Sequence, residues 1–118
     1  MKEKDLNSII ISAIQDKKGE KITLIDLSDI QGSSVPEFII CQGKNPSQTY
    51  AIAENIKEKV REELHMHEVT SEGYRNSQWI ILDYGSLMVH IFLPEPREFY
   101  NLEELWADGK ITNIPDLD

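Results

Sequence analysis

Two β-rich segments separated by Gly85-Ser86 constrain the fold more strongly than any other part of the sequence. Residues 79–84 (WIILDY) and 87–93 (LMVHIFL) are dominated by branched and aromatic side chains that favour strands, and the glycine between them favours a two-residue hairpin turn. With that turn, Asp83 pairs with Met88. Because side chains alternate along a strand, one face carries an apolar set that we predict to be core: Ile80, Leu82, Tyr84, Leu87, Val89 and Ile91.

The opposite face of the same hairpin has a mixed character. It carries large apolar groups together with one acid and one imidazole: Trp79, Ile81, Asp83, Met88, His90 and Phe92. Either a helix of the same chain covers this face, or it is the centre of a protein-binding patch, where aromatic residues and methionine are enriched. The strands alone favour helix cover, because strands between two helix layers are apolar on both faces. A register change of one residue would exchange the two faces.

The first part of the chain predicts one helix and two strands. Apolar residues recur at helical spacing over residues 5–18, with Asp5 as a cap. Residues 21–27 and 37–41 favour the two strands. Farther along the chain, beyond a second helix, residues 67–73 favour a third strand more weakly.

A second, longer helix is predicted to begin after Asn45 and to run to about residue 65. Asn45 suits the N-cap, Pro46 suits the first turn, and Gln48 occupies the position from which a capping box reaches back. The buried side of this helix is expected to consist of Thr49, Ile52, Ala53, Ile56, Val60 and Leu64.

Beyond the hairpin, residues 97–106 predict a short helix. Its LEELW segment places three apolar residues on the side that we expect to dock on the domain, namely Leu102, Leu105 and Trp106, and directs Glu103 and Glu104 outward. Residues 109–118 show no periodicity and are expected to form a loose tail. The sequence therefore predicts one α/β domain over residues 1–108, a mixed sheet of about five strands with helices packed on it.

Charge and composition narrow the classes of partner. The 118 residues carry a formal net charge of −9, and residues 94–118 hold seven carboxylates and two basic side chains. Nucleic-acid binding draws on lysine and arginine, so a basic protein is the more plausible partner. We predict a cytoplasmic protein, because Cys41 is the one cysteine and MKEKDLNSII lacks the apolar core of a signal peptide. We expect no membrane partner, because the apolar runs are far shorter than the roughly 20 residues of a membrane span.

The residue types that most often act in catalysis or bind metals have structural explanations in this sequence. Asp83 and His90 lack a nucleophile on a G-x-S-x-G turn, so a hydrogen-bonded histidine is favoured over a hydrolytic triad. Cys41 lies in an apolar strand, where it is expected to be a packing residue. His65 and His67 have no further ligands with metal-site spacing and are expected to face solvent.

Phosphate-binding patterns are also incomplete. Residues 32–34 (GSS) and 84–86 (YGS) are similar to the Gly-Ser of nucleotidyltransferases, but neither is followed by the D-x-D-like acidic pair that would hold Mg²⁺. No glycine-rich nucleotide loop is present. We therefore expect no cofactor and no metal.

A long motif in the second half of the chain gives a more specific signal. Residues 78–106 (QWIILDYGSLMVHIFLPEPREFYNLEELW) match a W-[IV]-x-[IVL]-D-x-G-[DS]-[IVL]-x-V-H-[IVL] hairpin followed by R-x-x-Y-x-L-E-x-L-W. The first half agrees at Asp26, at FIIC-x-G (residues 38–43) and at Q-x-x-A-I-A (residues 48–53), which follows Ser47. Over about residues 5–107, the chain resembles the ribosomal silencing factor (Iojap) family.

The resemblance implies a mixed-sheet α/β domain with nucleotidyltransferase-like topology but without the catalytic acids, and a protein that is not an enzyme. Family members bind the large ribosomal subunit at its fourteenth protein, on the intersubunit face. They block association with the small subunit and lower translation under nutrient limitation, and organelle relatives act in large-subunit assembly. For this chain we expect little direct rRNA contact because of its negative charge. We expect a docking surface that is formed or supported by Trp79, Asp83, Met88, His90, Phe92, Tyr100, Leu102, Glu103 and Trp106.

Two departures and two alternatives accompany this interpretation. The family usually has an acid where this chain has Ser86, and a C-T-G-x-S loop where it has CQGKNPSQ. A homodimeric scaffold, paired through the mixed hairpin face, and a degenerate nucleotidyltransferase or hydrolase remain as alternatives.

Overall fold

The computed structural model describes residues 5–30 and 35–116, and this part of the chain forms one six-stranded mixed sheet with helices on both faces. The GSS segment of residues 32–34 lies outside the described residues. Along the chain the elements are α1 (Leu6–Asp16), β1 (Glu20–Asp26), β2 (Glu37–Gln42), α2 (Pro46–Leu64), β3 (Thr70–Glu72), β4 (Trp79–Asp83), β5 (Met88–Phe92), α3 (Pro94–Tyr100), α4 (Leu102–Leu105) and β6 (Lys110–Ile114).

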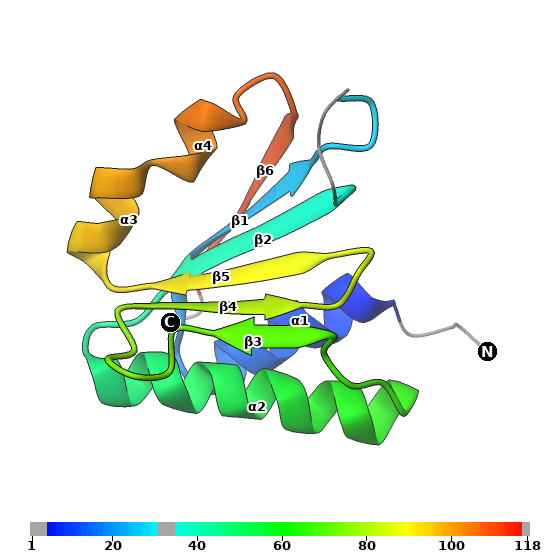
Figure 1. Ribbon diagram of the computed structural model, residues 1–118, viewed down its shortest axis with the longest axis vertical. Coiled ribbons are helices and arrows are strands. Elements are labelled where there is room, and N and C mark those ends of the chain that lie inside the picture. Colours follow the sequence, from blue (N-terminus) through cyan, green and yellow to red (C-terminus); the bar gives the residue numbers. More distant parts are fainter. Residues whose placement is uncertain (1–4, 31–34, 117–118) are drawn as a thin grey trace.

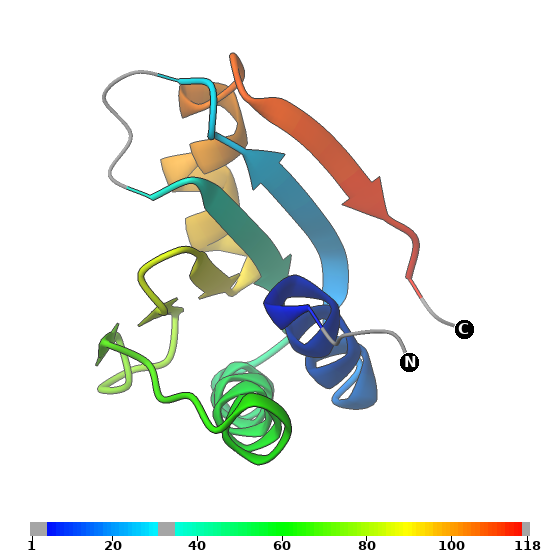
Figure 2. The same ribbon diagram turned by 90° about the vertical axis from the view of Figure 1, so that its right-hand side faces the viewer.

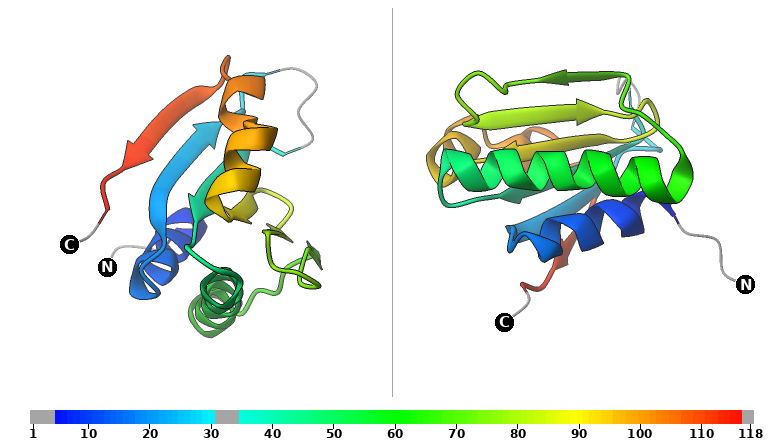
Figure 3. Two further views of the ribbon diagram at one scale, coloured as in Figure 1. Left: turned by 90° about the vertical axis from the view of Figure 1, so that its left-hand side faces the viewer. Right: turned by 90° about the horizontal axis from the view of Figure 1, so that it is seen from below.

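The sheet has the strand order β3-β4-β5-β2-β1-β6 (Figure 1). Only the central pair β2 and β5 is parallel, and the other neighbours are antiparallel. The helices α1 and α2 lie side by side on one face, as the right-hand view of Figure 3 shows. The short helices α3 and α4 lie on the other face (Figure 2). The predicted mixed α/β sheet with packed helices is confirmed.

The core follows the predicted faces of the hairpin. The face toward α1 and α2 buries the whole predicted apolar set of the hairpin, from Ile80 to Ile91, together with the inner sides of both helices. Five of the six residues predicted for the inner side of α2 are buried, and Leu64 at its last turn is half-buried. Asn55 is a further buried residue, whose Nδ2 donates to the carbonyl of Ala13 at 2.9 Å and so joins α2 to α1.

The N-terminus of α2 forms the cap that the sequence predicts, with one difference. The Oδ1 of Asn45 accepts a hydrogen bond from the backbone N–H of Gln48 at 2.9 Å. The Oε1 of Gln48 reaches back to the N–H of Lys44, at 2.7 Å, one residue before the N-cap. Its Nε2 donates to the carbonyls of Lys17 and Lys18, so one side chain caps the start of α2 and the end of α1. Asp5, in contrast, is an N-cap without a side-chain hydrogen bond.

The hairpin has the predicted register. Asp83 pairs with Met88, and the pairing continues residue by residue to Trp79 and Phe92. Gly85 has a φ of +87°, which glycine adopts without a Cβ penalty. The carboxylate of Asp83 accepts a hydrogen bond from the N–H of Gly85 at 2.8 Å and closes the turn.

Two predictions for the C-terminal part are wrong. Residues 110–114 are not a loose tail but form β6, which pairs antiparallel with β1 along its full length. The helix predicted over residues 97–106 begins earlier, at Pro94, and is divided into α3 and α4 at Asn101, which has a φ of +46°. Asparagine tolerates this left-handed conformation better than most residues, and such a residue ends a helix.

Candidate functional site

The second face of the hairpin carries most of a cluster of aromatic rings. Phe92 is fully buried and His90 is 4% exposed. The ring of Phe38, on the neighbouring strand β2, meets the His90 ring edge-on at a centroid distance of 4.7 Å, and Trp79 stacks on Phe92 at 4.9 Å. We call Phe38, Trp79, His90 and Phe92 the aromatic face of the sheet. These four side chains project from β2, β4 and β5 because alternation gives all of them the same side.

His90 is held as a neutral hydrogen-bond acceptor. The indole Nε1 of Trp79 donates to Nδ1 of His90 at 3.1 Å, which places the proton of the neutral imidazole on Nε2. The buried Nε2 has no hydrogen-bond partner among the described residues. Burial lowers the pKa of His90 to about 4, because the charged form is poorly solvated there.

Asp83 and His90 therefore have separate tasks, although they share a face of the hairpin. The carboxylate of Asp83 closes the turn on Gly85, and the imidazole of His90 accepts from Trp79. The favoured interpretation of a hydrogen-bonded histidine is confirmed. Cys41 is a buried packing residue, as expected, and burial raises the pKa of its thiol to about 12.

The C-terminal helices cover part of the aromatic face. Tyr100 of α3 lies against Trp79 at a centroid distance of 4.6 Å, and Trp106, directly after α4, meets Phe38 edge-on at 5.9 Å. Helix cover, which the strands alone favour, is therefore correct for the buried rings of His90 and Phe92. Trp79, Met88 and Trp106 are only half-buried, so the rim of the cluster reaches the surface.

Large apolar side chains are exposed on the outer side of these helices. Phe99 is 81% exposed, Leu105 is 69% exposed and Tyr100 is 50% exposed. The Phe99 and Tyr100 rings are in edge-on contact at 5.1 Å. Sequence reasoning missed Phe99 and wrongly placed Leu105 against the domain. The prediction assumed one continuous helix. The break at Asn101 turns α4 relative to α3 and so changes which residues face outward.

Two further predicted site residues belong to the inner side of α4. Leu102 is half-buried and packs against the second core cluster, which includes Phe38 and Phe92. Glu103, expected to point outward, instead accepts hydrogen bonds from Nη2 and Nε of Arg97 at 3.2 and 3.4 Å. It is an ion-pair partner within the fold because the buried arginine needs a counter-charge.

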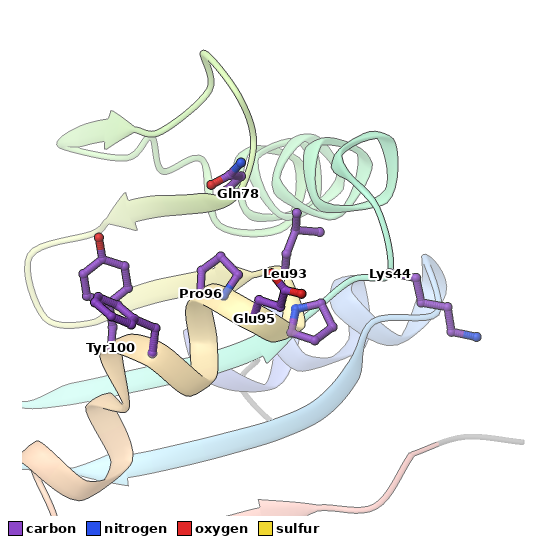
Figure 4. A pocket seen from close by; sticks show the side chains of 8 residues that line it. Lys44, Gln78, Leu93, Glu95, Pro96 and Tyr100 are labelled. Atoms are coloured by element: carbon purple, nitrogen blue, oxygen red, sulfur yellow. The ribbon is translucent and has the colours of Figure 1, made fainter.

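A surface pocket of about 760 Å³ adjoins Tyr100 (Figure 4). It lies where α3 begins, between the end of β5, the residue before β4 and the loop before α2. Its lining includes Phe99 and Tyr100 as well as Leu93, Pro96, Gln78 and Lys44. We define the docking patch as six half-buried or exposed apolar residues on and around the aromatic face, of which Phe99 and Tyr100 also line the pocket: Trp79, Met88, Phe99, Tyr100, Leu105 and Trp106.

The surroundings of the docking patch are acidic. Exposed carboxylates on or beside α3 and α4 are Glu95, Glu98, Glu104 and Asp108. The one basic residue between positions 94 and 108 is Arg97, which is buried and paired. Within residues 5–30 and 35–116, no three His, Cys, Asp or Glu side chains are grouped so that they could hold a metal ion. No helix in these ranges has the length and apolar character of a membrane span.

These features define a small mixed-sheet α/β domain with an aromatic patch surrounded by acidic residues. Known proteins are similar to it in sequence and in fold. The family described as "Ribosomal silencing factor during starvation" matches residues 1–118. Ribosomal silencing factors from Halalkalibacterium halodurans and Bacillus subtilis are 35% and 34% identical, covering 97% of this chain and 96% and 95% of theirs.

A crystal structure from Chromobacterium violaceum has a TM-score of 0.82 with 31% identity, over 91% of this chain and 88% of that one. The chain belongs to the ribosomal silencing factor family. The family resemblance inferred from residues 78–106 and from the first half of the chain is thus confirmed.

Proposed function

We propose that the protein represses translation by binding the large ribosomal subunit through its docking patch and by sterically blocking association with the small subunit. The binding partner in this proposal is the fourteenth large-subunit protein at the intersubunit face, and the repression serves conditions of nutrient limitation. Family membership supports a role at the ribosome. A contribution to large-subunit assembly is compatible with the same contact.

The observation that carries the proposal is the exposure of aromatic and apolar side chains within an acidic surface. Phe99, Tyr100 and Leu105 are at least half exposed, although their burial against the domain would be favourable. Exposed apolar patches with a polar rim mark protein-interaction sites. The surrounding carboxylates suit a basic partner, which they would attract and orient, while the aromatic anchors would supply affinity.

We divide the nine residues of the predicted docking surface into two groups according to the contacts that they make within the fold. Trp79, Met88, Tyr100 and Trp106 reach the surface and are proposed contacts. The remaining five are proposed to support the patch: Asp83, His90, Phe92, Leu102 and Glu103. In this arrangement the supporting residues, of which His90 and Phe92 are buried and the other three half-buried, fix the strands and helices. Phe99 and Leu105 are added as contacts.

Two tyrosines of equal exposure allow a controlled test. Tyr100 is 50% exposed in the docking patch, and Tyr50 is 49% exposed on α2, which packs on the opposite face of the sheet. Tyr100→Ala is expected to weaken co-sedimentation with purified large subunits by about tenfold or more, since an aromatic anchor at an interface commonly contributes that much. Tyr50→Ala should bind as the wild type does. Equal binding by both variants would show that the patch is placed wrongly.

We further propose that the protein acts in the cytoplasm by binding and not by catalysis. The alternative of a degenerate nucleotidyltransferase predicts saturable binding of a nucleoside triphosphate with Mg²⁺, which calorimetric titration would detect. A homodimeric scaffold predicts concentration-dependent sedimentation of the free protein, and a Trp79→Ala variant would then shift toward monomer.

A further inference from the structure

Arg97 is the one buried residue of α3, with 9% of its surface exposed, and α4 has no buried residue. Helices of seven and four residues are too short to be stable on their own. The place of α3 and α4 on the sheet therefore depends on a few tertiary contacts. Besides the half-buried packing of Leu102 and Trp106, the largest set of such contacts belongs to the Arg97 guanidinium.

This guanidinium joins four elements of the fold. From α3 it donates to the carbonyl of Lys21 at 2.6 Å and to the hydroxyl of Thr23 at 3.1 Å, both on β1. It also donates to Oε1 of Gln42 on β2 at 3.4 Å, and to the Glu103 carboxylate on α4. The Thr23 hydroxyl in turn donates to Asn113 of β6 at 2.9 Å.

The acceptor on β1 is built by an irregularity in the strand. The register between β1 and β2 shifts between Glu20 and Thr23, and Lys21 has a φ of +52°. Such a bulge removes backbone groups from the ladder and re-aims them. The freed carbonyl of Lys21 accepts from Arg97, and its N–H donates to the carboxylate of Asp116 at 2.8 Å. Side chains from the C-terminal part of the chain therefore satisfy both groups.

The position of Arg97 links this cluster to the docking patch. Tyr100 follows Arg97 by three residues, about one helical turn, and its ring lies against Trp79. Leu105 and Trp106 belong to the segment that Glu103 ties to the same guanidinium. A rotation of α3 or α4 would therefore move the exposed rings relative to the strand that carries Trp79.

We propose that Arg97 is a positioning residue of the docking patch: its guanidinium, bound to the bulge of β1 and to Glu103, fixes α3 and α4 so that Tyr100 lies beside Trp79. This inference rests on the proposed function for its consequence in binding. Buried ion pairs contribute little net stability in many proteins, but they can select one arrangement of packed elements. Arg97 makes no contact with the partner in this account.

The test compares Arg97→Met with a matched control. Lys57→Met removes another paired cation, one that binds Glu54 and Glu68 on the α2 side of the protein. For Arg97→Met we expect large-subunit binding to weaken at least about tenfold, because fewer molecules would hold α3 and α4 in the binding arrangement, and one hydrogen bond to a charged group is worth about that factor. We expect amide hydrogen exchange in residues 94–106 to become faster while α2 stays protected. Lys57→Met should leave binding and the exchange of residues 94–106 unchanged.

A second variant keeps the test decisive if Arg97→Met does not fold. Arg97→Met combined with Glu103→Leu removes every hydrogen bond of the guanidinium and also the charge of its partner, so that no unpaired buried charge is left to prevent folding. If the folded double variant keeps wild-type exchange in residues 94–106 and binds large subunits as the wild type does, Arg97 has no positioning role. Faster local exchange with weaker binding supports the role. If the wild type itself fails to bind, the proposed function fails, and exchange alone still reports whether Arg97 holds α3 and α4.

Discussion

His90 should make the stability of the protein depend on pH in a defined window. Its imidazole is buried in the aromatic face, and burial lowers its pKa from 6.5 to about 4. Between these two values the unfolded chain binds a proton that the folded chain does not. Stability is therefore fully present above pH 6.5 and falls as the pH decreases toward 4.

The size of the effect follows from the pKa difference. One pKa unit corresponds to 1.36 kcal/mol, so His90 alone is expected to reduce the free energy of unfolding by about 2 kcal/mol at pH 5 and about 3 kcal/mol near pH 4. Protonation would also place a proton on Nδ1, opposite the indole N–H of Trp79. The hydrogen bond between the rings would then be lost.

A His90→Gln variant isolates this contribution. Glutamine offers an amide oxygen to Trp79 but does not titrate, while every other ionisable group is retained. Urea unfolding followed by circular dichroism at pH 7, 6 and 5 should show wild-type stability decreasing by about 2 kcal/mol more than that of the variant between pH 7 and 5. His67→Gln, which replaces an exposed histidine, controls for the substitution itself. Parallel pH profiles for the wild type and His90→Gln would refute the reasoning.

Three further predictions concern buried or conformationally restricted positions. Gly73→Ala should destabilise the fold by at least about 3 kcal/mol, because a Cβ at φ +91° would lie 1.9 Å from the Trp79 carbonyl oxygen. Gly85→Ala should lose only about 1–2 kcal/mol, because Gly85 has a φ of +87° but open space around it. Thermal melts of both variants provide the comparison. The Cys41 thiol, buried and with a raised pKa, should react with a disulfide reagent only as fast as the protein unfolds, which the rate against urea concentration measures. Asn55→Ala should lose about 1–3 kcal/mol in chemical unfolding, because a carbonyl of α1 is left buried without its donor.

The hairpin was predictable because its signals are local. Alternation of side chains, β-forming residues and a glycine at the turn determine which residue faces which, and the register from Trp79 to Phe92 agrees with the structure. The N-terminus of α2 was predictable for the same reason, since Asn45, Pro46 and Gln48 act within one helical turn.

The C-terminal features depend on partners that are distant in sequence. The strand β6 is an edge strand whose residues are mostly exposed, so its pattern carries little apolar alternation, and its pairing with β1 is a backbone property. The inward turn of Glu103 depends on Arg97, which in turn depends on a carbonyl freed by a bulge at Lys21. A bulge leaves no clear signal in a single sequence.

The family motif contains most residues of the proposed site but does not distinguish the roles of its members. Asp83, His90 and Arg97 match the motif, and the structure gives each a task within the fold: closing a turn, accepting from Trp79, and joining α3 to the sheet. Their hydrogen bonds within the fold separate these residues from the proposed partner contacts, and which side chains are bonded or exposed is a property of the assembled fold. Phe99 shows this most clearly, because its helix presents it almost fully to solvent.

A subunit-joining assay tests the central claim most directly. Purified large subunits, incubated with the protein in excess and then mixed with small subunits, are separated on a sucrose gradient. We expect joined ribosomes to decrease as the protein concentration rises, the protein to migrate with the large subunit, and Tyr100→Ala to require about tenfold more protein than Tyr50→Ala for the same decrease. Undiminished joining at concentrations that saturate the large subunit, or no binding at all, would contradict the account.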